Sequence, residues 1–250
     1  MRPHVAAIYA FARQADDFAD EGENTGKEIS LLAGWEKNLR LCYEGQARFP
    51  TFVALADTVK RFDLPMQLFL DLLDAFKQDV LVKRYETFGD VLNYCRCSAN
   101  PVGRLVLLLF GYKEERYFAW SDAICTALQL TNFWQDLAVD WKKGRTYIPL
   151  EDFRRFGYSL EELDSAVQNN AFRRLMEFEV QRTRSLFQQG QPLLRELKGR
   201  LKMELALVWL GGQRILTKLR DVDFDCFSKR PTLRALDKAW MLYTVICRPP

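Results

Sequence analysis

Apolar residues recur at three- and four-residue intervals along most of the chain, the spacing that places them on one face of a helix. The first such stretch runs from Val5 to about Glu21, after Pro3, a residue that suits the first turn of a helix. Gly22 to Gly26 then breaks the pattern. Further helices are predicted at about 29–43, 51–62, 65–83, 88–99, 105–110, 119–141, 160–169, 171–188, 192–198, 201–219 and after Pro231.

Two interruptions inside this pattern have local causes. Pro101 forces Asn100 toward extended geometry, so a break or kink is expected there, with the helix resuming at the apolar run Leu105–Phe110. Gly211 and Gly212 lie inside a predicted helix, where they either let another helix approach closely or leave room for a ligand chain. Close packing is the favoured explanation.

Composition narrows the classes of protein that the helical pattern allows. The chain has 250 residues, of which 48% are hydrophobic and 28% charged, a balance that is ordinary for a globular protein. It excludes disordered, collagen-like and disulfide-framework chains, and the long apolar stretches argue against a β-sandwich or barrel. Because there is no Gly-, Ser- or Pro-rich linker and no repeat of about 20–50 residues, we expect one all-α domain over residues 1–250.

Charge, histidine and cysteine content exclude several functions. The 36 basic and 33 acidic residues leave a net charge of +3, spread too evenly to indicate a nucleic-acid-binding face. The single histidine, His4, excludes His-based triads and His metal sites, and the glycine-rich motifs that bind nucleotides are absent. Six scattered cysteines are typical of reduced thiols in the cytoplasm, and the sequence predicts neither a membrane span nor an export signal.

The first predicted helix carries an acidic motif near its end. Asp16 and Asp20 are four residues apart, so they point the same way on a helix, and Tyr9 and Arg13 share that face. A solvated acidic helix end would give the same pattern, and this motif alone does not distinguish the two.

A second acidic motif lies in the most apolar predicted helix. Asn132, Asp136 and Asp140 follow one another at four-residue steps, within about 80° on a helix that advances about 100° per residue. Their neighbours are overwhelmingly apolar, and burying two carboxylates there costs free energy unless a cation pairs with them. A solvated helix face is therefore the weaker explanation of this motif.

Two acidic motifs on separate helices are the arrangement expected if they face each other across a cavity and hold divalent cations. Magnesium binds oxygen ligands, often one or two carboxylates together with substrate phosphates, so a diphosphate is the predicted ligand. Lys142, Lys143 and Arg145 follow the second motif and would add charge-assisted hydrogen bonds to that diphosphate. The rest of the cavity should be apolar, lined by Leu105–Phe110 and by the residues next to Asn132.

Three segments resemble the squalene/phytoene synthase family: Tyr9–Glu21, Tyr94–Gly103 and Thr131–Pro149. The resemblance extends over nearly the whole chain and includes both acidic motifs. Within the family, Cys95–Gly103 and Asn132–Asp136 are similar to the members that convert presqualene diphosphate to hydroxysqualene in the bacterial route to squalene, which feeds hopanoid synthesis. The resemblance implies an all-α isoprenoid-synthase fold, a helical bundle around a central cavity.

The resemblance also implies roles for individual residues. The implied magnesium ligands are Asp16, Asp20, Asn132, Asp136 and Asp140. The residues implied to line the site, with catalytic roles, are Tyr9, Arg13, Tyr94, Arg145 and Tyr147. Those implied to bind the substrate are Arg13, Asn100, Lys143, Arg145 and Arg230. Asp17 belongs to the first motif and is expected in a supporting catalytic role on the opposite side of the helix.

Two departures from the family pattern change these expectations. Many relatives have arginine where this chain has Gln135, and a neutral amide there can orient the water that captures a carbocation. Family members usually begin with a further segment that approaches the diphosphate, whereas this chain starts at Met1 almost inside its first helix. We therefore expect a catalytic role for Gln135 and a missing N-terminal segment.

The expected reaction is the magnesium-assisted ionisation of presqualene diphosphate, followed by rearrangement of the carbocation and capture by water, with no nicotinamide cofactor. Two rivals remain. One is head-to-head condensation of prenyl diphosphates, giving presqualene diphosphate or phytoene; the other is a non-catalytic assembly or lipid-binding relative, which the intact carboxylates disfavour. The expected partners are the prenyl diphosphate, a membrane contacted peripherally from the cytoplasm, and neighbouring pathway enzymes that pass on intermediates, but not nucleic acid.

Overall fold

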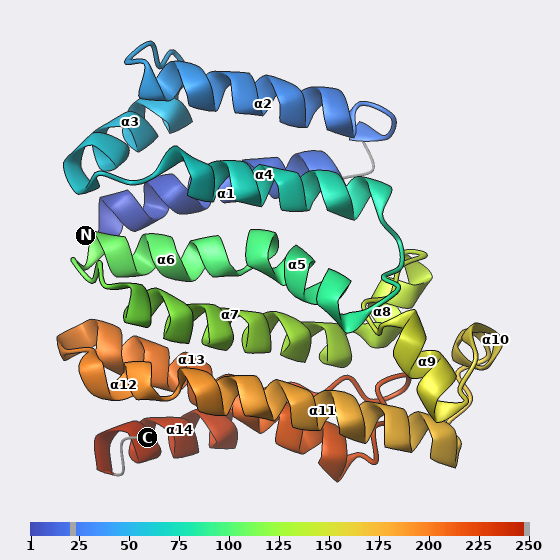
Figure 1. Ribbon diagram of the computed structural model, residues 1–250. Helices are drawn as coiled ribbons and strands as arrows, with labels where there is room; N and C mark the ends of the chain where they lie inside the picture. The colour runs from blue at the N-terminus through green and yellow to red at the C-terminus, as the bar shows by residue number, and fades with distance from the viewer. Residues whose placement is uncertain (21–23, 248–250) are drawn as a thin grey trace. The chain divides into compact units, whose positions relative to one another are not determined.

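The computed structural model describes residues 1–20 and 24–247, and all the regular secondary structure within them is helical (Figure 1). Helices make up 77% of the structure, which confirms the all-α class. The predicted end of the first helix at Glu21 and the break from Gly22 lie outside the described residues. No helix in the described ranges combines the length and the apolar character needed to cross a bilayer.

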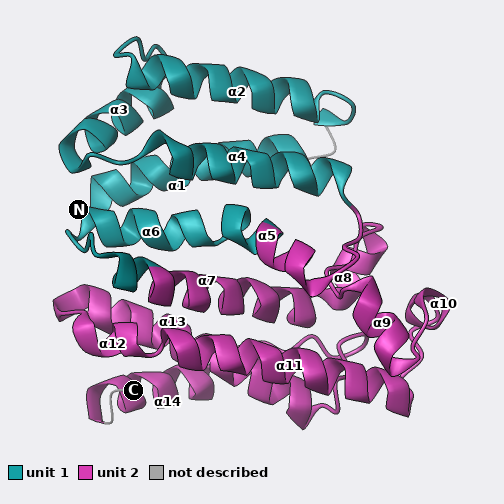
Figure 2. Cartoon of the chain, viewed as in Figure 1, with its two compact units in different colours: residues 1–82, 94–118 teal, residues 83–93, 119–250 magenta. Residues whose placement is uncertain are grey.

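The chain divides into two compact units, shown in different colours in Figure 2. Unit 1 comprises residues 1–82 and 94–118, and unit 2 comprises residues 83–93 and 119–250. Two of the three boundaries fall inside α5 (Phe88–Ser98) and α7 (Glu115–Gln135), each of which begins in one unit and ends in the other, and the third lies between Val82 and Lys83. The single domain expected from the sequence stays a prediction.

Unit 1 is formed by the adjoining parts of α5 and α7 and by α1 (Arg2–Asp20), α2 (Glu28–Tyr43), α3 (Pro50–Phe62), α4 (Met66–Leu81) and α6 (Asn100–Leu109). Helix α1 packs against α2, α3 and α4. It buries one stripe at helical spacing: His4, Ala7, Ile8, Phe11 and Ala15. The ring of Phe11 meets those of Phe52 and Phe69 edge-on, with centroids 6.0 and 5.3 Å apart.

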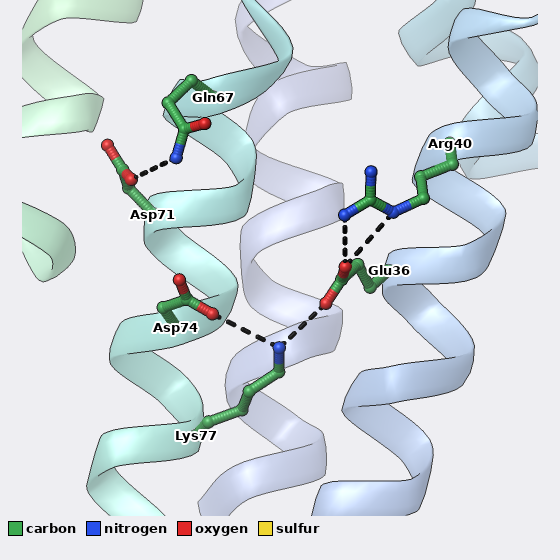
Figure 3. Close-up of polar contacts among 6 residues, drawn as sticks. All are labelled: Glu36, Arg40, Gln67, Asp71, Asp74 and Lys77. Carbon is green, nitrogen blue, oxygen red and sulfur yellow. Dashed lines mark hydrogen bonds and ion pairs between the residues drawn. The ribbon is translucent and has the colours of Figure 1, made fainter.

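A polar network ties α2 to α4 in unit 1 (Figure 3). Lys77 Nζ lies 2.8 Å from Glu36 Oε2 and 3.3 Å from Asp74 Oδ1, and Arg40 Nη2 donates to Glu36 Oε1 over 2.7 Å. The hydrogen bonds from Lys77 and then Arg40 lower the pKa of Glu36. Because these side chains are partly exposed, water weakens each ion pair and its contribution to stability is small.

Unit 2 contains the remaining helices, namely α8 (Leu137–Lys142), α9 (Leu150–Phe156), α10 (Leu160–Asp164), α11 (Asn170–Gly190), α12 (Pro192–Glu196), α13 (Gly199–Asp221) and α14 (Ala235–Cys247). Two glycines in this unit lie where a neighbouring helix leaves no room for a side chain. A Cβ on Gly190 would lie 2.4 Å from Ile124 Cγ1, and one on Gly212 would lie 2.4 Å from Phe187 Cζ. Gly212 therefore serves close packing, as the sequence predicted.

Several helix boundaries differ from the sequence prediction. The continuous helix over 119–141 is wrong, because Asp136 leaves helical geometry at φ −104° and ψ 12° and separates α7 from α8. The break before Pro101 falls on Ala99, since proline fits the first turn of the helix that starts at Asn100. Helix α9 was not expected; it starts after Pro149. Helix α10 ends at Asp164, well short of the expected Asn169.

Candidate functional site

The first acidic motif lies on the face of α1 opposite its buried stripe. Arg13 Nη1 lies 2.9 Å from Asp16 Oδ2, and its Nη2 lies 2.7 Å from Asp17 Oδ1. One guanidinium thus bridges two carboxylates, because it precedes them by three and four residues. The expectation that Asp17 points away from Asp16 is wrong. Tyr9, 66% exposed, and Asp20 lie on the same outer face of the helix.

Tyr94 and Asn100, also predicted for the site, are buried in unit 1. Tyr94 Oη donates to Asp79 Oδ1 over 2.7 Å. Sequence reasoning missed Asp79, and no signal distinguished it, because it shares α4 with other acidic residues and belongs to neither motif. Leu105 and Leu108, from the apolar run after Asn100, pack in the core of unit 1. The expectation that this run lines a cavity stays a prediction.

The second acidic motif lies in unit 2, where α7 ends and α8 begins. Although Asp136 interrupts the helix, its amide donates to the Asn132 carbonyl over 2.8 Å, and the Asp140 amide donates to the Asp136 carbonyl over 2.9 Å. These bonds preserve the four-residue register, so the interruption is local. Asn132 is exposed, whereas Asp140 is 8% exposed.

Each carboxylate of this motif is paired with an arginine. Arg230 donates from Nε and Nη2 to the two oxygens of Asp136, and the second of these bonds is 3.0 Å long. Arg145 Nε lies 3.3 Å from Asp140 Oδ1, and both of these side chains are less than 15% exposed. Burial raises the pKa of Asp140, and the positive charge of Arg145 partly offsets this effect. Arg145 and Arg230 thus provide the positive charges that the carboxylates of this motif need in an apolar environment.

The loop after α8 brings aromatic rings to this region. Tyr147 stacks on Phe133, with ring centroids 3.6 Å apart and planes 3° from parallel, and on Tyr85 at 5.8 Å. The Arg145 guanidinium lies 6.0 Å from the Tyr147 ring centroid. Sequence reasoning missed Tyr85 and Phe133; their only signal was aromatic character, which many core residues share.

Backbone hydrogen bonds fix the position of that loop within unit 2. The Thr146 amide donates to the Lys83 carbonyl, and the Leu150 amide donates to the Tyr85 carbonyl, each over 3.0 Å. These bonds connect two segments that lie about sixty residues apart in the sequence. Predicted residues Arg145 and Tyr147 are therefore held in place, while Lys143 is exposed beside them.

Unit 2 also contains an apolar cavity of about 400 Å³ lined by α7, α13, α14 and the segment before α14. Its polar lining includes Asn132 and Gln135, and Gln135 Nε2 donates to the Pro231 carbonyl. Gly211 also lines it, where a Cβ would lie 3.3 Å from Met241 Cε. Gly212 lines the same cavity, whose volume is typical of a small-molecule site.

The chemistry of the two motifs fits magnesium, because carboxylate and amide oxygens are the ligands that this ion prefers. Among residues 1–20 and 24–247, no three His, Cys, Asp or Glu side chains come together as a metal-binding group. The expectation that the two motifs face each other stays a prediction.

Comparison with known proteins places the chain in a family. The squalene/phytoene synthase family model matches residues 1–237. The 15-cis-phytoene synthase of Synechococcus elongatus is 30% identical over 94% of this chain and 81% of its own, and the hydroxysqualene synthase of Rhodopseudomonas palustris is 33% identical over 94% and 80%. The crystal structure of squalene synthase HpnC from Alicyclobacillus acidocaldarius gives a TM-score of 0.86 at 39% identity, covering 89% of this chain and 84% of that one. A dehydrosqualene synthase in complex with ligand gives 0.88 at 25% identity, covering 97% and 85%. The protein therefore belongs to the squalene/phytoene synthase family.

Proposed function

We propose that this protein ionises presqualene diphosphate and captures the resulting carbocation with water, releasing hydroxysqualene and diphosphate. The observation that carries the proposal is the second acidic motif, which has two arginine-paired carboxylates and whose Asn132 lines an apolar cavity of about 400 Å³. Similarity to the hydroxysqualene synthase of Rhodopseudomonas palustris, at 33% identity, supports the choice of reaction.

In this proposal the diphosphate end of the substrate binds at the acidic motifs. The proposed magnesium ligands are Asp16, Asp20, Asn132, Asp136 and Asp140. Bound magnesium would supply positive charge that stabilises the departing diphosphate. Arg145, Arg230 and exposed Lys143 add charge-assisted hydrogen bonds to the phosphate oxygens, with Arg13 and Asn100 as further contacts in unit 1.

The carbocation phase uses the apolar groups of unit 2. When the C–O bond breaks, its electron pair leaves with the diphosphate, and the apolar lining of the cavity holds the hydrocarbon while the carbocation rearranges. The buried, stacked rings of Phe133 and Tyr147 lie beside the second acidic motif but not in the lining of this cavity, so the proposed role of Tyr147 is to fix the position of the loop that carries Arg145. Because Gln135 Nε2 is bonded to the Pro231 carbonyl, its Oε1 is the atom that can accept a hydrogen bond from the attacking water. That water adds its oxygen to the carbocation and loses a proton to the diphosphate.

The experiment is a turnover assay with purified protein, presqualene diphosphate and magnesium in ¹⁸O-labelled water without any nicotinamide. Mass spectrometry should detect hydroxysqualene that carries the label. A chelator should abolish the product, and adding magnesium back should restore it. Gln135→Leu should divert product toward unhydroxylated hydrocarbons, whereas Gln135→Asn should retain more of the alcohol. A complete lack of turnover of presqualene diphosphate would refute the proposal.

Condensation of two prenyl diphosphates is the second candidate, because relatives named phytoene synthase match this chain at 30, 30 and 28% identity. The acidic motifs serve both reactions and do not separate them. Consumption of farnesyl or geranylgeranyl diphosphate without turnover of presqualene diphosphate would select this candidate. For either substrate we propose peripheral membrane contact, and passage of intermediates to or from neighbouring pathway enzymes.

A further inference from the structure

Helix α14 exposes an unusually apolar face. Its buried stripe consists of Asp237, Met241 and Val245, and it packs on α13. The exposed large apolar side chains, defined here as the α14 apolar face, are Leu236, Trp240, Leu242, Tyr243 and Ile246. At about 100° per residue they cover an arc of about 160° on the side away from the buried stripe. Leu236 is 84% exposed and Ile246 is 69% exposed.

This face is a cluster rather than a scatter of single residues. Five of the 13 residues of α14 are exposed large apolar side chains, while α1 and α13, the next richest of the described helices, have two each. Single exposed apolar residues are normal on a protein surface, whereas contiguous ones mark contact with a membrane or another protein.

The charges around the α14 apolar face are positive. Between residues 226 and 247 the exposed charged side chains are Lys229, Arg230, Arg234 and Lys238, all basic. Arg230 is paired with Asp136 and Lys229 lies 3.9 Å from Asp225, so Arg234 and Lys238 carry the positive charge beside this face. The acid in this segment, Asp237, is buried, and it lies 2.7 Å from both Lys218 and Arg214. On the neighbouring α13, exposed Glu204 is paired with Arg200 at 2.5 Å.

We propose that α14 lies on the surface of an anionic lipid bilayer, with its apolar face inserted at the boundary between headgroups and acyl chains. An apolar arc with basic flanks is the pattern of an interfacial helix, and tryptophan and tyrosine favour that depth. The opposite side of α14 carries Met241, which lines the apolar cavity. The choice of a lipid surface over a protein rests on the proposed function, whose substrate would enter from lipid.

The test is co-sedimentation of the purified chain with vesicles of phosphatidylglycerol and phosphatidylcholine. Leu236→Gln with Trp240→Gln should lower the partition coefficient at least about tenfold. The matched control, Val53→Gln with Leu81→Gln, changes side chains that are 53% and 69% exposed on α3 and α4 and should leave binding unchanged. Arg234→Gln with Lys238→Gln should weaken binding to the anionic vesicles and have little effect with pure phosphatidylcholine.

Equal vesicle binding by the wild type and the Leu236→Gln, Trp240→Gln variant would overturn the proposal. The proposal would also be overturned if the wild type did not bind vesicles but formed a dimer, seen by light scattering, that the variant does not form. The α14 apolar face would then be a contact between two copies of the chain. Circular dichroism checks the folding of each variant, and the charge variant provides an independent test if the apolar one is unstable. Turnover of detergent-dispersed presqualene diphosphate should be equal in the wild type and the apolar variant. If neither the wild type nor the apolar variant turned over this substrate, the result would contradict the proposed function but not the membrane contact of α14.

Discussion

The two acidic motifs have the same four-residue spacing but very different surroundings. In α1, Asp16 and Asp17 share Arg13, which comes from the same helix, and the side chains of Asp16 and Arg13 are 43% and 52% exposed. In α7 and α8, the carboxylates of Asp136 and Asp140 are 17% and 11% exposed. Their arginine partners come from outside the helices that carry them.

The difference shows two ways of keeping like charges close together. On an exposed helix, water screens the carboxylates and a neighbour in the next turn is enough. In an apolar environment, each carboxylate needs its own cation, and the chain must bring that cation from elsewhere. The first motif is therefore formed as soon as α1 forms, whereas the second depends on the folding of unit 2.

The largest expected effect tests whether both motifs serve one reaction. If the proposed function is correct, Asp16→Asn and Asp136→Asn should each lower turnover of presqualene diphosphate by at least about 1,000-fold, because each removes a charged side chain proposed to bind magnesium. Asp74→Asn, on an exposed part of α4, is the matched control and should leave turnover unchanged. Normal turnover in the Asp16→Asn variant would show that the first motif is only a solvated helix end.

A smaller effect on stability should separate the surroundings of the two motifs. Arg145→Met leaves Asp140 buried without its cation, and urea denaturation should show a loss of about 2–4 kcal/mol. Arg13→Met affects an exposed pair and should cost less than about 1 kcal/mol. Adding Asp140→Asn to Arg145→Met should recover part of the loss. Equal losses for the two arginine variants would contradict the contrast drawn between the motifs.

Glu179 is a further buried carboxylate, and it shares its neighbouring cation, Arg182, with Asp152. Glu179 is fully buried on α11, and its carboxylate lies 3.5 Å from Arg182 Nε. Arg182 is closer to Asp152, at 2.7 Å, and its guanidinium lies over the rings of Phe88 and Phe178. Burial raises the pKa of Glu179 to about 8, while Arg182 opposes this effect.

A raised carboxyl pKa means that the folded state holds a proton that the unfolded state releases. The free energy of unfolding should therefore fall as pH rises from about 4.5 to 8, by up to about 1.4 kcal/mol for each pH unit. Glu179→Gln removes this proton, so its stability relative to the wild type should increase with pH across that window. Urea denaturation of the wild type and the variant, measured side by side at about pH 5, 6, 7 and 8, checks this difference. A constant difference would mean that Glu179 is already ionised at pH 5.

Local features of the fold and the site could be predicted from the sequence. The spacing of Asp16 and Asp20 fixes their common face, because a helix turns by the same angle at every residue. The apolar stripe of α1 was predictable for the same reason, and so was the role of Gly212 in close packing. Each of these predictions depends only on residues of one helix.

The features of the fold and the site that the sequence did not predict depend on contacts between distant parts of the chain. Arg230 and Asp136 are 94 residues apart, and no periodicity links them. The break at Asp136 keeps its backbone bonds to neighbouring turns, so nothing in the local sequence announces it. Likewise, the hydrogen bond between Tyr94 and Asp79 and the stacking of Tyr85 on Tyr147 arise only when helices and loops pack.

Gly211 and Gly212 are neighbours with opposite tolerances. At Gly212 the ring of Phe187 leaves space for a hydrogen atom only, so the distance between α13 and α11 is set there and resists substitution. At Gly211 a Cβ would lie 3.3 and 3.4 Å from the ends of the Met241 and Leu233 side chains, which would have to shift slightly. A side chain at residue 211 would therefore narrow the cavity of unit 2 at the cost of small shifts in two flexible side chains, whereas one at residue 212 would require the ring of Phe187 to move.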